Sequence, residues 1–145
     1  MDPRVRRFAI FAAVTALVVT SSLVPMSTTA DRASTVDMVP LPSGTDKLLH
    51  GVGYAAVAYT LRRTLPARFR RDGNDLRPDG TDPSIVALVG VAATATAIGA
   101  GVEVVQGAVP GRDPSTLDAV ANAVGAAVGV VVWWWRETYR SRRGT

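Results

Sequence analysis

Three side chains able to exchange protons stand near the ends of otherwise apolar segments. His50, Glu103 and Asp118 each lie about 6–7 Å inside a predicted helix end, at a rise of about 1.5 Å per residue. Ionisable groups inside a membrane are costly and usually mark a functional site. An imidazole beside two carboxylates can act as general acid and general base on a bound substrate. We therefore predict these three residues as the catalytic groups, if the protein is an enzyme.

The spacing of the neighbouring polar residues predicts that each segment turns one polar face inward. Asp46, His50 and Tyr54 follow one another at intervals of four, which places them on one side of a helix. Asp118 and Asn122 are also four residues apart. The residues that we predict to bind a ligand are Asp46, Lys47, Tyr54, Gln106, Arg112 and Asn122.

Two of these residues are cations that could hold an anionic group. Lys47 offers an ammonium group, and Arg112 offers a guanidinium group, which can bind a phosphate or carboxylate through two parallel hydrogen bonds. The chain contains no cysteine, which excludes disulfides and thiolate chemistry. One imidazole with two carboxylates is a weak metal signature. We therefore predict neither a metal centre nor a cofactor.

The elements that must position these residues are four apolar segments. A helix needs about 17–25 mostly apolar residues to span a bilayer. The first, third and fourth segments meet this length, and the second is at its lower limit. Residues outside the segments are too few to enclose them in a soluble core. The sequence therefore predicts an all-α, four-span transmembrane helical bundle built from Phe8–Pro25, Leu48–Leu65, Ser84–Gln106 and Leu117–Trp135.

The arginines predict the orientation of this bundle, because basic residues mark the cytoplasmic side of a membrane protein. They gather before the first segment, between the second and third, and after the fourth. Both termini should therefore be cytoplasmic in a multi-pass protein of the cell membrane. This distribution also explains the formal charge of +4, so we expect the lipid bilayer, and not nucleic acid, as the partner. The arginines of these three groups are Arg4, Arg6 and Arg7, the six from Arg62 to Arg77, and Arg136, Arg140, Arg142 and Arg143.

Three regions follow from this pattern. Residues 1–26 form an N-terminal transmembrane segment, 45–135 the main membrane domain, and 136–145 a basic cytoplasmic tail. The first region also has the basic, apolar and small-residue parts of a signal peptide. Cleavage after Ala30 would leave three spans.

Helix boundaries are marked by capping residues. Pro83 and Pro114 each follow an aspartate, as is typical of the first helical position after an N-cap. Thr45 is a predicted cap for the second segment, and Gly107 suits the end of the third. The connection after Gly107 is short, so the third and fourth segments should pack as an antiparallel hairpin.

Stripes of small residues predict where helices approach closely in a membrane. Gly125 and Gly129 continue the stripe of Asp118 and Asn122 on the fourth segment. Ala93, Ala97 and Gly101 form a similar stripe on the third. We therefore expect both stripes to face the bundle interior together with the polar residues.

Three stretches of the sequence, DKLLHGVGYAAVAY, EVVQ and PGRDPSTLDAVANAVGAAVG, resemble the signature blocks of the VanZ-like family. The resemblance covers about Thr45–Val130. Gly51 departs from it, because the family commonly has an aromatic or bulky apolar residue after the histidine. The resemblance implies a small multi-helix membrane protein. The founding member is associated with teicoplanin resistance, and no biochemical activity is settled for the family. The residues in register are Asp46, Lys47, His50, Tyr54, Glu103, Gln106, Arg112, Asp118, Asn122 and Gly125.

Taken together, these features predict an outward-facing polar pocket that binds or acts on an envelope lipid, a lipid-linked molecule or a peptide. The alternative is a non-catalytic assembly or accessory protein, in which the polar residues only hold helices together. A small transporter ranks third, because Glu103 and Asp118 lie nearer the outer end than the midplane. The sequence leaves the oligomeric state open.

Overall fold

The computed structural model describes residues 1–23, 45–66, 83–109 and 115–143. All regular secondary structure in these residues is helical, which confirms the predicted all-α class. The four helices are α1 (Pro3–Leu23), α3 (Thr45–Thr64), α4 (Pro83–Gln106) and α5 (Thr116–Arg143).

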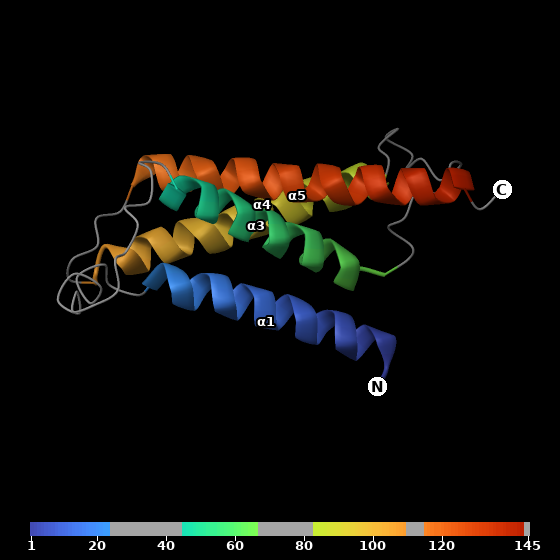
Figure 1. The fold of residues 1–145 in the computed structure, drawn as a ribbon, viewed down its shortest axis with the longest axis horizontal. Coiled ribbons are helices and arrows are strands. Elements are labelled where there is room, and N and C mark those ends of the chain that lie inside the picture. Colours follow the sequence, from blue (N-terminus) through green and yellow to red (C-terminus); the bar gives the residue numbers. More distant parts are fainter. Residues whose placement is uncertain (24–44, 67–82, 110–114, 144–145) are drawn as a thin grey trace, which may run out of the picture.

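The helices form an elongated bundle in which the chain direction alternates (Figure 1). Helices α3 and α5 run in one direction, and α1 and α4 run in the other. We call the end that contains Leu23, Thr45, Gln106 and Thr116 the His50 end. The opposite end contains the first residue of α1 and the last residue of α5, and we call it the termini end. The predicted antiparallel hairpin of α4 and α5 is therefore confirmed.

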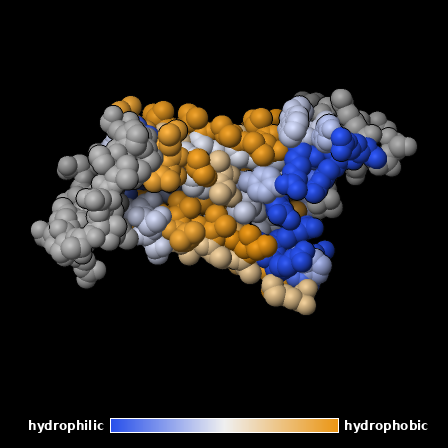
Figure 2. Space-filling model, viewed as in Figure 1, coloured by the Kyte–Doolittle hydropathy of each residue, from blue (hydrophilic) through white to orange (hydrophobic). Residues whose placement is uncertain are grey.

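Among the described residues, three helices are long and apolar enough to cross a membrane: Pro3–Leu23, Ser84–Gln106 and Thr116–Arg140. They indicate a membrane protein. Helix α3 is not among them, because charged residues stand near both of its ends, namely Asp46 and Lys47 at the start and Arg62 and Arg63 in the last turn. Figure 2 shows apolar residues across the middle of the visible face and hydrophilic residues gathered at the termini end.

Helix α3 packs most extensively against α5 and also contacts α1 and α4. The seam between α3 and α5 is a contact of backbone with backbone. A Cβ atom on Gly125 would collide with the carbonyl oxygen of Gly51, and one on Gly129 would collide with that of Ala55. Small residues four apart on both helices allow this approach. The predicted packing role of Gly125 and Gly129 is therefore confirmed, and the backbone of Gly51 is the surface that receives Gly125. A Cβ atom on Gly51 itself would make an ordinary contact, 3.7 Å from the carbonyl oxygen of Ala121.

The prediction that the small-residue stripe of α4 faces the bundle interior is wrong. Ala93, Ala97 and Gly101 are exposed, and a Cβ atom on Gly101 would meet nothing within 4 Å. The face that packs inward carries Ala95 and Gly99 instead. Helix α4 has small residues on two sides, and the position of Glu103, four residues after Gly99, identifies the inner one.

The apolar core lies between the middles of the helices. Buried residues of α3, α4 and α5 form it, and residues of α1 pack against it from outside. A bundle of this kind supports the polar residues at its His50 end on a rigid apolar base. The core residues are Val57, Ala58, Val91, Ala95, Ala126 and Val130.

The helix ends agree largely with the predicted caps. Helix α3 begins at Thr45, α4 begins at Pro83, and Gly107 follows the last residue of α4. The predicted Asp113–Pro114 cap of α5 lies outside the described residues. Helix α5 begins at Thr116, so Asp118 stands in its first turn and donates its backbone N–H to the carbonyl of Ser115 at 3.0 Å.

Candidate functional site

A cluster of polar side chains is buried at the His50 end of the bundle. Its members come from α3, α4 and α5, and each is at most 8% exposed. Polar groups at this depth normally need partners, because burying an unpaired one is costly. The buried members of this cluster are His50, Tyr54, Glu103, Gln106, Asp118 and Asn122.

Asn122 occupies the centre of the cluster. Its Oδ1 accepts a hydrogen bond from Nδ1 of His50 at 3.2 Å. On the other side, a Cβ atom on Gly99 would lie only 2.9 Å from Nδ2 of Asn122. The Asn122 side chain therefore fills a space between α3 and α4 that exists because residue 99 has no side chain.

The contact with Asn122 orients the imidazole ring of His50, because Nδ1 lies 3.2 Å from the amide oxygen. An imidazole held in this way can exchange protons with a bound molecule in either direction.

Asp118 forms the link between the buried cluster and the surface. Its Oδ1 lies 3.6 Å from the ammonium of Lys47, whose side chain is 44% exposed while that of Asp118 is 12% exposed. The ion pair joins α5 to α3 one turn above the His50–Asn122 hydrogen bond. Lys47 is thus the described cation nearest the cluster and the one that an approaching anion would meet.

Glu103 is held by one oxygen only. Its Oε2 accepts a hydrogen bond from the backbone N–H of Ser115 at 3.2 Å, which ties α4 to the residue before α5. Its Oε1 is buried without a hydrogen-bond partner among the described residues. The hydroxyl of Tyr54 lies within electrostatic reach of the Glu103 carboxylate and is likewise unpartnered there.

Gln106 contacts the first helix. Its Nε2 donates a hydrogen bond to the backbone carbonyl of Ser22 at 2.6 Å. The Ser22 contact was not predicted from the sequence, since nothing in residues 1–26 marked Ser22 as a partner. This bond fixes the end of α1 against the end of α4.

Two predicted ligand-binding residues are not placed. Arg112 lies outside the described residues, and so does the side chain of Asp46. Within the described part of the chain, no group of three or more His, Cys, Asp or Glu side chains could hold a metal ion.

Sequence reasoning missed one charged residue of interest. Arg62 was counted with the topology-marking arginines, but its side chain is 1% exposed and lies over the ring of Trp133 at 3.9 Å. The available signal was its position, because Arg62 belongs to the apolar segment Leu48–Leu65 and not to the connection after it.

The chemistry of the cluster follows from its groups. An oriented imidazole, two carboxylates, a phenol and an amide can bind a polar molecule and exchange protons with it. They contain no buried nucleophile with an adjacent base of the kind that forms acyl intermediates. The chain matches no protein-family model, and the searches of curated proteins and of solved structures found no match to it.

Proposed function

We propose that this chain is a VanZ-like integral membrane protein of the cell envelope that binds or acts on a lipid, lipid-linked or peptide ligand at its His50 end. One observation carries the proposal. The hydroxyl of Tyr54, Oε1 of Glu103 and Nδ2 of Asn122 are all buried and have no hydrogen-bond partner among the described residues.

The three groups make a complementary set. The Tyr54 hydroxyl and the Asn122 amide can donate hydrogen bonds, and the Glu103 oxygen can accept them. Each unsatisfied buried group costs about 1–3 kcal/mol, so three of them on three helices are expensive for a purely structural cluster. A bound polar ligand or ordered water that supplies donors and acceptors would recover this energy.

The roles of the charged residues follow from their surroundings. His50 would accept or return a proton, with Glu103 or Asp118 as the carboxylic partner. Lys47, at the exposed side, would attract a phosphate or carboxylate on the ligand. Arg112, which the VanZ-like resemblance includes, would share that task.

The proposed membrane arrangement has four spans, because α3 is added to the three helices that are apolar enough to cross a membrane. Its 20 residues correspond to about 30 Å of helix, which is the thickness of the hydrocarbon layer. Its charged residues stand near its ends, at the level of the membrane interface. Arginines at the termini end then favour a cytoplasmic position for both termini, and the His50 end faces outward.

A second candidate is a non-catalytic assembly or accessory protein. The hydrogen bonds His50–Asn122 and Gln106–Ser22 favour it, because both join helices that are distant in sequence. A small transporter ranks below it, because the cluster lies near one end of the bundle and not at the midplane.

The test is a comparison of envelope lipids and surface composition between a deletion strain and strains that carry variants. Glu103→Gln keeps the shape of the side chain and an oxygen for the Ser115 N–H but removes the charge. We expect it to fail to restore the wild-type composition while its protein level stays near normal. Asp118→Asn should behave in the same way, and the double variant should be no worse than either single one, as for groups that act as a unit.

Asp2→Asn, which removes an exposed carboxylate far from the cluster, is the matched control and should restore the deletion strain fully. An unchanged deletion strain would contradict the proposal. Loss of the folded protein in Glu103→Gln would favour the assembly protein instead.

A further inference from the structure

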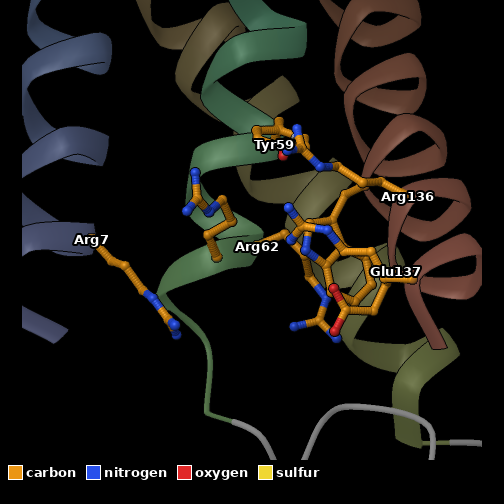
Figure 3. Close-up of a pocket in the computed structure, with 8 residues that line it drawn as sticks. Arg7, Tyr59, Arg62, Arg136 and Glu137 are labelled. Atoms are coloured by element: carbon orange, nitrogen blue, oxygen red, sulfur yellow. Dashed lines mark hydrogen bonds between the residues drawn. The ribbon is translucent and has the colours of Figure 1, made fainter. Parts of the chain in front are cut away.

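A cavity of about 110 Å³ lies at the termini end, far from the polar cluster. Its walls come from α1, α3 and α5, and Figure 3 shows side chains from all three helices around it. The volume is enough for a phosphate-sized anion with some water, since one water needs about 10–15 Å³ of such space. Five of its eight lining residues are arginines: Arg7, Arg62, Arg63, Arg136 and Arg140.

Basic side chains outnumber acidic ones in the described lining of this cavity. Among the described residues, Glu137 is the one carboxylate that lines it. Like charges gathered around one space repel each other, most strongly where water is scarce. A bound anion would remove this repulsion and accept several guanidinium hydrogen bonds at once.

Two aromatic residues organise the arginines. Arg62 lies over the ring of Trp133 and is almost completely buried. The hydroxyl of Tyr59 accepts a hydrogen bond from Arg136 at 3.2 Å. These contacts hold guanidinium groups of α3 and α5 in defined positions beside one another.

Orientation in the membrane does not require this arrangement. Basic residues set orientation through their number in the connections and tails, and exposed arginines anywhere on the cytoplasmic side would serve. The arginines that three helices place around one cavity need a separate explanation.

We propose that the cavity binds a phosphoryl group, carried by the headgroup of an anionic phospholipid. The residues that line the cavity belong to the termini end, where Figure 2 shows hydrophilic residues gathered next to the apolar middle of the bundle. In the proposed membrane arrangement this level corresponds to the lipid headgroups. Basic pockets between membrane helices are suited to such headgroups, and arginine can bind phosphate through two parallel hydrogen bonds. The inference is independent of the function proposed for the His50 end.

The test uses the full chain in a neutral detergent and three probes: phosphatidylglycerol, phosphatidylcholine and inorganic phosphate. Binding is followed by native mass spectrometry and by the thermal unfolding midpoint. Phosphatidylglycerol should bind and raise the midpoint, and phosphatidylcholine should do neither. In the double variant Arg136→Gln/Arg140→Gln, affinity for phosphatidylglycerol should fall roughly tenfold or more, because each lost hydrogen bond to a charged group weakens binding by about that factor.

The matched control is Arg4→Gln/Arg143→Gln, which removes the same charge from exposed positions outside the cavity and should keep most of the affinity. Both double variants keep Arg62 and its contact with Trp133, so both should fold and elute from a sizing column as the wild type does. Binding of inorganic phosphate that the cavity variant loses would support a phosphoryl site and overturn the assignment to a lipid. Equal losses in both double variants, or no preference for phosphatidylglycerol, would overturn the proposal.

Discussion

At the scale of single residues, Asn122 is the side chain that joins two neighbouring helices within the polar cluster, through His50 of α3 and Gly99 of α4. Its depth and its place on the polar face of α5 could be predicted from the spacing of Asp118 and Asn122. Its partners could not, because a one-dimensional pattern does not show which residue of α3 or α4 lies opposite. The structure pairs His50 with Asn122 and Asp118 with Lys47.

Asn122→Ala tests this central position. The change removes the acceptor for Nδ1 of His50 and leaves an empty space beside Gly99. We expect a loss of about 1–3 kcal/mol in stability, the usual cost of a buried polar group that loses its partner, seen as a lower thermal unfolding midpoint in detergent. Thr94→Ala is the control, because the Thr94 hydroxyl is exposed and bonds only within its own helix, to Gly90. Equal unfolding midpoints for the two variants would show that the His50–Asn122 hydrogen bond does not contribute to stability.

At the scale of helices, the closest contact is the seam of α3 and α5. Gly125→Ala should destabilise the protein by about 1–3 kcal/mol, as overpacking usually does, because the new methyl group meets the backbone of Gly51. Gly101→Ala should instead be neutral or stabilise by about 0.5–1 kcal/mol, because alanine favours a helix over glycine and the space there is open. Thermal unfolding of both variants checks the opposite signs. A destabilised Gly101→Ala variant, or a tolerated Gly125→Ala variant, would contradict the packing.

The helices themselves were largely predictable, and their faces only partly so. Segment length and capping residues indicated four helices and most of their ends, since both are local properties of the chain. The inner face of α4 was misassigned, because small residues occur on two of its sides and only tertiary contacts distinguish them. The packing role of Gly51 was also missed, since it depends on a glycine 74 positions later.

At the scale of the whole molecule, the alternating helices bring the start of α1 and the end of α5 to one side (Figure 1). If α3 crosses the membrane, reporter fusions at Arg71 and at the C-terminus should both report the cytoplasm, and a fusion near Ala108 should report the exterior. The physical reason is the excess of arginine on the side of the termini. A fusion at Arg71 that reports the exterior would rule out the four-span arrangement. A C-terminal fusion made in the same vector serves as the internal reference.

The glycine seam also determines how this protein responds to mutation. No amino acid is smaller than glycine, so every missense change at Gly125 or Gly129 adds atoms to a contact that has no room for them. A second mutation on the facing helix cannot compensate by shrinking, because that surface is already bare backbone. Random mutagenesis should therefore recover few substitutions at these positions, and suppressors of them should map to residues that let a whole helix shift.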